Sequence, residues 1–359
     1  MKVALIIPSV HWNCPYVDIY ARLFDSHGVK YDIISFNRKL DKEDTKYHFD
    51  YGLSNNSDTH KKLIAVLKYC SFIKRILKKE KYDRLVVFSS QLGIGLLQIL
   101  LKEYKGRFII DYRDLSIEQR LKYPFKKVLG SSYMNVISSP GFKRVLPQGY
   151  EYILCHNFDV SLAEKAIHDD KAGKWHEGKK KILTIGGIRD YEANVKVINA
   201  IKDSSDYSLS FVGRGESSDL LSNYCKEMGV KNVSFVGFYK KEEEAGYIDN
   251  SDFINIFYPR RLTHDTAVSN RFYNSLIHKK PMITTADTTQ GDFAAKYGLG
   301  IALDDCNNLV DRLESFQKEN DYGQYSKRCN ELLLRFIGEQ HLFEQKVLEF
   351  VDTPKTFHC

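Results

Sequence analysis

The chain has 359 residues, of which 43% are hydrophobic and 28% are charged, and its formal net charge is +7. This length accommodates two domains with separate cores, and the composition is ordinary for a globular protein. No segment is long and uncharged enough to span a membrane, and the apolar run at residues 1–7 is too short for a signal peptide. We therefore expect a soluble, cytoplasmic protein.

The cysteines point to the same compartment. There are 7 of them, widely spaced and without a Cys-x-x-Cys pair. An odd number with this spacing argues against a disulfide framework and against a zinc site, and it suits a reducing cytoplasm.

The first half of the chain alternates apolar strands with helical segments. Expected strands cover residues 2–7, 31–36, 84–88, 107–112, 135–138 and 152–155, and expected helices cover residues 18–27, 61–81 and a segment from about 92. Residues 40–59 are polar and aperiodic, which predicts a long loop. The alternation predicts an α/β fold with a parallel, doubly wound sheet.

The basic helix at residues 61–81 has two interpretations. Its predicted apolar stripe consists of Leu63, Leu67, Cys70, Ile73 and Leu77. The stripe can pack on the sheet while the lysines are solvated, which we favour. Alternatively, the lysines hold the protein at the inner face of an anionic membrane that carries a lipid-linked acceptor.

The second half repeats the alternation after a polar, glycine-containing linker at residues 171–181. Expected strands cover residues 181–185, 207–212, 233–236, 253–257, 282–285 and 300–303, and expected helices cover 194–202, 218–228, 242–247, 270–278, 292–297 and 325–351. We therefore expect an N-terminal domain at 1–170, a C-terminal domain at 171–340, and a helical tail at 341–359 that returns to the N-terminal domain.

Residues 269–285 combine a helix start with a following strand. Ser269 and Asn270 are good N-cap residues, Pro281 stops the helix, and the next strand begins at Met282. A helix that starts at the carboxyl edge of a parallel sheet offers backbone N–H groups and a favourable dipole to a phosphate.

Several segments of the second half occur in a recognisable order. KILTIGGIRDYEANVKVINAI is followed by YSLSFVGRGES, by NVSFVGFYKKEEEAGYIDNSDFINIFYP and by SNRFYNSLIHKKPMITT. Together they resemble the donor-binding domain of glycosyltransferases with the GT-B architecture, most closely glycosyltransferase family 4 and its capsule and exopolysaccharide members. The resemblance covers residues 181–305, and it touches the first half through FIIDYRDLS, VISSPGFKRVLP and CHNFD.

The resemblance implies two Rossmann-like domains that face each other across a cleft, with a nucleotide-diphospho-sugar in the second domain. Without a metal, Arg189 and the helix start at Ser269 would stabilise the leaving diphosphate. The implied donor-binding residues are Gly187, Arg189, Lys196, Gly213, Phe238, Thr266, Ser269, Asn270, Arg271 and Asn274. Alternatives remain open: turns at Gly187 and Gly213, a solvated Lys196, and a core or loop role for Phe238.

One departure from the family concerns two glutamates that its members usually carry eight positions apart. In this chain the corresponding positions are Thr266 and Asn274. In the family these glutamates contact the donor sugar and its ribose. Neither position is a carboxylate here, so the donor identity, the ribose contact and the retaining stereochemistry that the resemblance implies stay open.

The same resemblance makes the first half the acceptor side. Asp111, Arg113 and Asp114 follow a strand at the carboxyl edge of the sheet. Asp111 or Asp114 could orient or deprotonate an acceptor hydroxyl, and Arg113 could bind an acceptor phosphate; the alternative is an Asp–Arg ion pair that fixes the loop. His11 and Asn13 follow the first strand and are further acceptor-binding candidates.

The resulting prediction is a metal-independent glycosyltransferase without a cofactor. It would use a UDP-sugar or GDP-sugar and a bacterial surface-glycan or lipid-linked acceptor. A nucleotide-sugar epimerase of the same fold and a non-catalytic partner of a glycosyltransferase are the alternatives. No nucleic-acid-binding module is evident.

Overall fold

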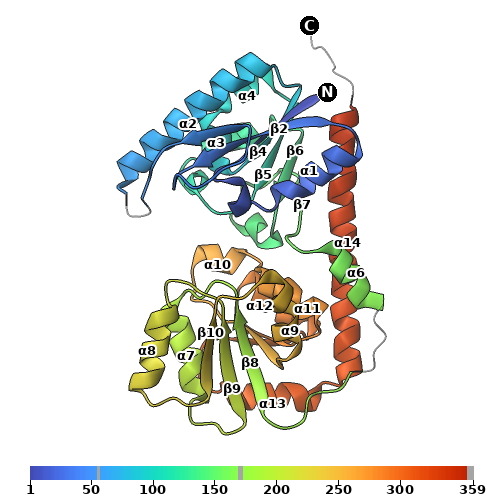
Figure 1. Ribbon diagram of the computed structural model, residues 1–359. Helices are drawn as coiled ribbons and strands as arrows, with labels where there is room; N and C mark the ends of the chain where they lie inside the picture. The colour runs from blue at the N-terminus through green and yellow to red at the C-terminus, as the bar shows by residue number, and fades with distance from the viewer. Residues whose placement is uncertain (55–56, 169–172, 354–359) are drawn as a thin grey trace. The chain divides into compact units, whose positions relative to one another are not determined.

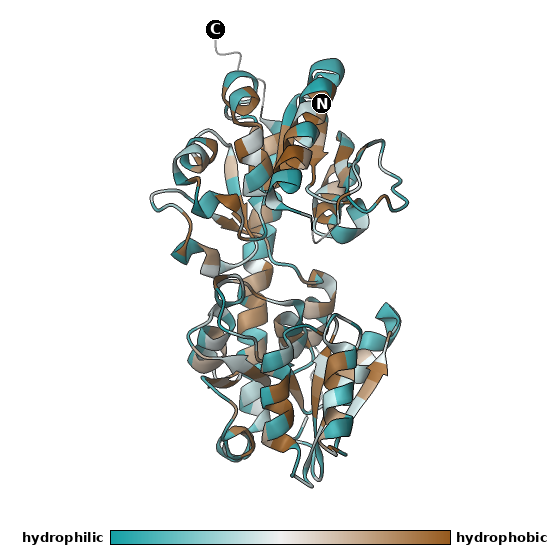
Figure 2. Ribbon diagram, turned by 90° about the vertical axis from the view of Figure 1, so that its left-hand side faces the viewer, coloured by the Kyte–Doolittle hydropathy of each residue, from teal (hydrophilic) through white to brown (hydrophobic). Residues whose placement is uncertain are grey.

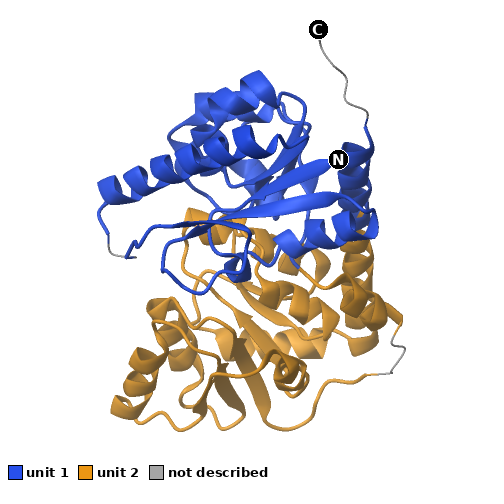
Figure 3. Ribbon diagram, turned by 45° about the horizontal axis from the view of Figure 1, so that its top comes forward, with its two compact units in different colours: residues 1–157, 339–359 blue, residues 158–338 orange. Residues whose placement is uncertain are grey.

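The computed structural model describes residues 1–54, 57–168 and 173–353 and divides into two compact units. Unit 1 consists of Met1–Asn157 and the chain from Glu339 onward, and unit 2 is Phe158–Gly338 (Figure 3). The division therefore falls before the linker that the sequence suggests at 171–181. Residues 171 and 172 of that linker lie outside the described residues.

Unit 1 contains a parallel sheet in the order β3-β2-β1-β4-β5-β6-β7. Figure 1 labels β2, β4, β5, β6 and β7 of this sheet. Its strands are β1 (Lys2–Ile6), β2 (Lys30–Asn37), β3 (Tyr47–Asp50), β4 (Arg84–Phe88), β5 (Phe108–Tyr112), β6 (Met134–Ile137) and β7 (Ile153–Leu154). Its helices are α1 (Val17–Ser26), α2 (Thr59–Glu80), α3 (Ser90–Gly95), α4 (Leu97–Glu103) and α5 (Lys122–Leu129), with 3₁₀ turns η1 (His11–Asn13), η2 (Ile117–Gln119) and η3 (Pro140–Arg144).

The central strands of unit 1 are apolar throughout because helices cover both faces of the sheet. Every residue of β4, β5 and β6 is buried. One core contains α1 and the end of α14, and the other contains α2, α3 and α5. The helices accordingly have one hydrophilic and one hydrophobic face (Figure 2).

Strand β3 was not predicted, because a loop was expected over residues 40–59. Its side chains alternate between half-buried and exposed. Phe49 stacks on Tyr69 of α2, with ring centroids 5.9 Å apart, so packing fixes this edge strand. Four residues inside a polar stretch are too few to produce a recognisable period of two.

Helix α2 also packs differently from the prediction. Its buried face consists of Ala65, Val66, Tyr69, Cys70, Ile73, Ile76 and Leu77. Leu63 and Leu67, which were assigned to the packed stripe, are 47% and 55% exposed. The stripe interpretation was therefore wrong for the first turns of the helix and right from Cys70 onward.

Unit 2 contains a parallel sheet in the order β10-β9-β8-β11-β12-β13. Its strands are β8 (Lys180–Ile185), β9 (Tyr207–Val212), β10 (Val233–Gly237), β11 (Phe253–Ile256), β12 (Met282–Thr285) and β13 (Gly300–Leu303). Its helices are α6 (Val160–His168), α7 (Tyr191–Ile201), α8 (Ser218–Glu227), α9 (Glu244–Asp249), α10 (Leu262–Thr266), α11 (Asn270–Ile277), α12 (Thr289–Tyr297) and α13 (Leu309–Glu319), with the 3₁₀ turn η4 (Lys241–Glu243).

The last helix, α14 (Tyr322–Asp352), contributes to both units. Tyr325, Cys329 and Phe336 belong to the core of unit 2. Phe343 and Val347 are fully buried in the core of unit 1. Two doubly wound parallel sheets, one per unit, confirm the predicted α/β fold class.

The described residues contain neither a disulfide bond nor a helix that could span a membrane. The six described cysteines are free and buried. In residues 1–54, 57–168 and 173–353, no helix has the length and apolarity needed to cross a bilayer.

Candidate functional site

The clearest site of unit 2 is a cavity of about 450 Å³ at the carboxyl edge of its sheet. The strand order reverses between β8 and β11, so the loops after these strands diverge there. The lining residues come from those loops, from the end of β10, from α9 to α11 and from α12: Ile185, Gly186, Gly187, Arg189, Asp190, Tyr239, Lys241, Glu244, Tyr258, His264, Ala267, Ser269, Asn270, Arg271, Asn274 and Gln290.

The loop after β8 brings Arg189 to this cavity. Gly186 adopts φ +94°, a conformation that favours glycine, and Gly187 is exposed. The Arg189 side chain is also exposed. Within the described part of the chain, no carboxylate forms an ion pair with it. Its charge is therefore available to an anionic ligand.

Gly213 and Gly215 support this loop from the neighbouring strand. A Cβ on Gly213 would lie 2.0 Å from the Gly186 carbonyl oxygen, and one on Gly215 would lie 2.1 Å from the Ile188 carbonyl oxygen. Gly213 also has φ +125°. The two glycines thus permit close approach of two backbone segments. Gly213, a predicted donor-binding residue, does not line the cavity itself.

The start of α11 forms another wall. Ser269 has the extended backbone of an N-cap, but its N–H and hydroxyl both donate to Gln290 Oε1, at 2.9 and 2.7 Å. The Ser269 side chain therefore leaves the helix start uncapped. Ser269 and Asn270 both line the cavity, and a helix start of this kind favours an anion.

Arg271, also on α11, is a buried residue of the cavity wall and hydrogen-bonds to the backbone. Its side chain is 9% exposed, and its guanidinium donates to the carbonyl oxygens of Ile185 at 2.5 Å, Gly187 at 2.9 Å and Asn255 at 3.4 Å. Arg271 thus holds the glycine loop in place. It still lines the cavity, so its positive charge contributes to the field there.

A carboxylate that the sequence analysis missed faces the same cavity. Glu244 Oε1 accepts from Asn274 Nδ2 at 2.9 Å and from Lys241 Nζ at 2.7 Å, and Oε2 accepts from the Tyr239 hydroxyl at 2.9 Å. Burial alone would raise the pKa of Glu244. The hydrogen bonds from Lys241, Tyr239 and Asn274 outweigh burial and lower this pKa below its usual value.

A second acidic group lies at the other end of the loop after β8. Asp190 has φ +59°, and its carboxylate lies 3.6 Å from Arg261 and 3.8 Å from His264 Nε2. The sequence analysis missed Asp190, Tyr258, His264 and Gln290 as well. The only available signal was their place just after a strand or at a helix start, which many surface residues share.

Besides Gly213, three predicted donor residues do not line this cavity. Lys196 is exposed on α7. Thr266 is buried and donates its hydroxyl to the Leu262 carbonyl oxygen at 2.7 Å. Phe238 is 79% exposed, next to the cavity residue Tyr239.

In unit 1, Asp111 and Arg113 form a buried ion pair rather than an open site. Asp111 is fully buried and accepts from Arg113 Nε at 2.6 Å, Arg113 Nη2 at 2.8 Å and the Tyr20 hydroxyl at 2.8 Å. Burial would lower the pKa of Arg113, but the Asp111 carboxylate outweighs it and raises that pKa. This is the loop-fixing alternative that the sequence analysis had left open.

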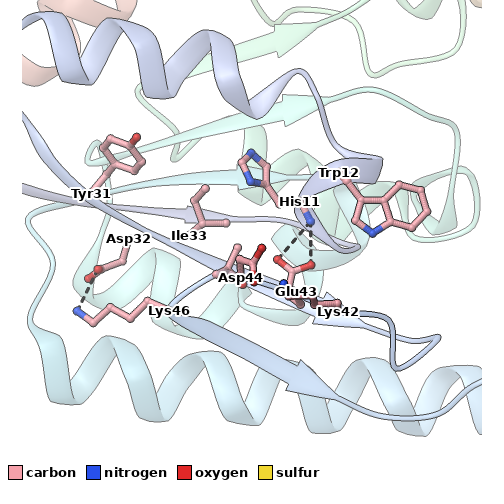
Figure 4. A pocket seen from close by; sticks show the side chains of 10 residues that line it. His11, Trp12, Tyr31, Asp32, Ile33, Lys42, Glu43, Asp44 and Lys46 are labelled. Carbon is pink, nitrogen blue, oxygen red and sulfur yellow. Dashed lines mark hydrogen bonds and ion pairs between the residues drawn. The ribbon is translucent and has the colours of Figure 1, made fainter. Parts of the chain in front are cut away.

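The other acceptor candidates lie near the surface of unit 1. Asp114 and Asn13 are exposed. His11 lines a hollow of about 370 Å³ beside β2 and the segment before β3 (Figure 4). The backbone N–H of His11 donates to Glu43 Oε2 at 3.2 Å, and the ring Nε2 of His11 lies 2.7 Å from Asp18 Oδ1. His11 therefore belongs to a local acidic cluster, and Asp114 does not line the same hollow.

Potential metal ligands are not clustered in the described residues. Within them, no group of three or more His, Cys, Asp or Glu side chains has the arrangement needed for a metal ion.

Comparisons with known proteins give structural relatives only. No family model matches the chain, and no curated protein matches it. A sucrose-phosphate synthase from Thermosynechococcus elongatus has a TM-score of 0.73 at 15% identity, covering 98% of this chain and 99% of that one.

Two further structures have the same fold. Anabaena HepE in complex with UDP has a TM-score of 0.62 at 10% identity, covering 97% of this chain and 100% of that one. UDP-GlcNAc 2-epimerase from Methanocaldococcus jannaschii has a TM-score of 0.55 at 16% identity, covering 94% of this chain and 99% of that one. At such identities the comparisons establish the fold, which is the two-domain GT-B architecture.

Proposed function

We propose that the protein is a glycosyltransferase that moves a sugar from a nucleotide-diphospho-sugar to a hydroxyl of a surface-glycan or lipid-linked acceptor. The observation that supports this most is that Arg189, which forms no ion pair with the residues that the structure describes, and the helix start at Ser269 line one cavity at the switch point of unit 2. HepE, a neighbour by fold, was solved with UDP.

Diphosphate departure is the step that this geometry would promote. As the glycosidic bond breaks, negative charge grows on the leaving diphosphate. Arg189, the α11 N-terminus and the charge of the buried Arg271 would stabilise that charge, and they require no metal. The exposed ring of Phe238 would flank the base of a UDP- or GDP-sugar.

The acceptor would bind to unit 1, with Asp114 as the group that orients or deprotonates its hydroxyl. Asp114 follows β5 at the carboxyl edge of the sheet and is exposed. Asp111 and Arg113 then act as positioning residues, because their buried ion pair fixes the segment that carries Asp114.

The exposed start of α2 supports a peripheral membrane role for unit 1. Leu63, Ile64 and Leu67 are 47%, 47% and 55% exposed, and Lys61, Lys62 and Lys68 are exposed between and beside them. Exposed aliphatic side chains flanked by lysines suit the interface of an anionic bilayer. A lipid-linked acceptor would be reached from such a position.

The test is to follow UDP-glucose, UDP-N-acetylglucosamine and GDP-mannose by NMR with and without a bacterial lipid extract. A transferase releases the nucleoside diphosphate and attaches the sugar to an acceptor. Isomerisation of the sugar without an acceptor would favour the epimerase alternative, to which the epimerase of the same fold gives some weight. No conversion and no nucleotide binding would favour a non-catalytic partner.

A further inference from the structure

A second hollow of unit 2 lies over one face of the sheet, away from the cavity at its carboxyl edge. Its volume is about 430 Å³, which falls within the range of about 300–1,000 Å³ that is usual for ligand pockets. The described residues that line it belong to β8, β9, β10, the segments before β8 and β10, and the end of α9. None of them lines the candidate donor cavity.

The hollow exists because part of one sheet face carries serine hydroxyls instead of apolar side chains. Ser210 of β9 is in register with Leu183 of β8 and with Ser234 of β10, so these side chains share a face, and Ser208 joins them two residues earlier on β9. Ser208 and Ser210 are half-buried, and Ser234 is exposed. Parallel sheets are normally covered by helices on both faces. An open, polar stretch of such a sheet is therefore a surface fitted to a polar ligand, and we call it the serine hollow.

The serine hydroxyls present acceptors to that ligand. Ser208 donates its own hydrogen to the Lys180 carbonyl oxygen at 3.2 Å, which leaves the oxygen lone pairs of Ser208 available. Ser210 and Ser234 share one hydrogen bond at 2.9 Å, so further acceptor positions remain on this pair. Neighbouring acceptors suit a ligand that is rich in hydroxyl donors, which is the chemistry of a saccharide.

Three lysines stand at the amino end of the serine hollow. Lys179, Lys181 and Lys231 line it and are exposed, and no carboxylate of the described residues forms an ion pair with them. Asp252 is close to Lys181, but its side chain is only 8% exposed, and its carboxylate accepts from the Lys181 backbone N–H at 2.7 Å. The rim of the hollow is therefore positively charged and attracts an anionic ligand.

We propose that the serine hollow binds an acidic saccharide, whose carboxylates pair with the lysines while its hydroxyls donate to the serines. A ligand that carries only charge, such as polyphosphate, would use the lysines and leave the serine acceptors without donors. The inference goes beyond the proposed function, because binding here requires neither a nucleotide-sugar nor transfer. Where both hold, unit 2 has a place for an acidic glycan that is separate from its donor cavity.

The experiment is calorimetric titration at fixed ionic strength with a hyaluronan oligosaccharide, which alternates glucuronate with N-acetylglucosamine, and with an uncharged chitin oligosaccharide. Wild type is expected to bind hyaluronan at least about tenfold more tightly than the chitin oligosaccharide, because hydrogen bonds to charged groups are the stronger ones. The double variant Lys181→Gln, Lys231→Gln should lose about tenfold in hyaluronan affinity, and Ser210→Ala should lose about fivefold, as expected for one neutral hydrogen bond.

The matched control for charge is the double variant Lys226→Gln, Lys318→Gln, at exposed positions on α8 and α13 of the same unit. It removes the same net charge and should bind hyaluronan as wild type does. Equal losses in the two double variants would show that only net charge matters, and this would overturn the proposal.

Two further results would also contradict it. Absence of hyaluronan binding to wild type is one. The other is a Ser210→Ala variant that binds hyaluronan as tightly as wild type, with polyphosphate displacing the saccharide, since that would identify a site for polyanions. Titration of UDP and GDP into the same variants separates this proposal from the proposed function, because their nucleotide affinity should equal that of wild type. Hyaluronan binding by a wild type that binds neither nucleotide would overturn the proposed function alone.

Discussion

At the scale of single residues, Asp111 is the buried charge whose removal has the clearest consequence. It neutralises Arg113, which also donates to the Cys155 carbonyl oxygen at 3.1 Å and lies over the Tyr16 ring. Replacing this carboxylate leaves a guanidinium without a counter-charge in a buried position. Such a change costs about 3–5 kcal/mol of folding stability.

Asp111→Asn should therefore unfold at a markedly lower urea concentration than wild type. Asp114→Asn, at the exposed position directly after Arg113, should change the free energy of unfolding by less than about 0.5 kcal/mol. Equal stability of Asp111→Asn and wild type would show that the ion pair does not fix this part of unit 1.

Three arginines that were predicted to bind anions show the limit of prediction from the sequence. Arg189, Arg271 and Arg113 all follow strands or begin helices at a carboxyl sheet edge, and each was predicted to meet an anion. Only the fold decides which guanidinium stays accessible. Arg271 is occupied by carbonyl oxygens from a segment that is distant in the sequence, and Arg113 is occupied by the buried carboxylate of Asp111.

At the scale of elements, Gly213 tests the contact between the loops after β8 and β9. An alanine there would place its Cβ 2.0 Å from the Gly186 carbonyl oxygen, so the loop that carries Arg189 has to shift. We expect Gly213→Ala to lower both the free energy of unfolding and the affinity for a nucleoside diphosphate.

The matched control is Gly229→Ala. Gly229 has φ +63° with no atom within 4 Å of an added Cβ, so only backbone strain of about 1–2 kcal/mol is expected. Its nucleotide affinity should equal that of wild type. The same loss of affinity in both variants would contradict a specific role for the Gly213 contact.

Helix α2 provides a prediction about the membrane. Leu63→Ser combined with Leu67→Ser should weaken sedimentation with vesicles that contain anionic phosphatidylglycerol, because two aliphatic groups no longer enter the interface. Leu220→Ser, at a position that is 57% exposed on α8, is the control and should sediment as wild type. Unchanged sedimentation of the double variant would exclude this face of α2 as the contact.

The sequence predicted the strands of both sheets better than the orientation of α2. Buried parallel strands are continuous apolar runs, which the sequence shows directly. In α2, Leu63 and Leu67 fit a helical stripe as well as Val66 and Tyr69 do, because apolar residues occur on two faces of this helix. Which face packs is decided by the partner surface, which a single sequence does not contain.

At the scale of the whole molecule, α14 joins the cores of both units in one helix. Phe343 is fully buried and makes an edge contact with Tyr20, with ring centroids 5.3 Å apart. Phe343→Ala should cost about 3–5 kcal/mol of stability in unit 1.

Hydrogen exchange can localise this loss. We expect faster amide exchange in β1 and α1 of the Phe343→Ala variant, with little change in β8 and β11 of unit 2. Equal acceleration in both units would show that they unfold as one cooperative body and not as two.

The site in unit 2 carries the central claim, which is that Arg189 and the start of α11 bind the diphosphate of a nucleotide-sugar. The most direct measurement is calorimetric titration of UDP and GDP into wild type, Arg189→Ala and Arg312→Ala, the last being an exposed arginine on α13 in the same unit. We predict binding of one nucleotide that weakens about 10-fold to 100-fold in Arg189→Ala, as expected for loss of a charged hydrogen bond, and no change in Arg312→Ala. Equal affinity in all three proteins, or no binding to wild type, would contradict the account.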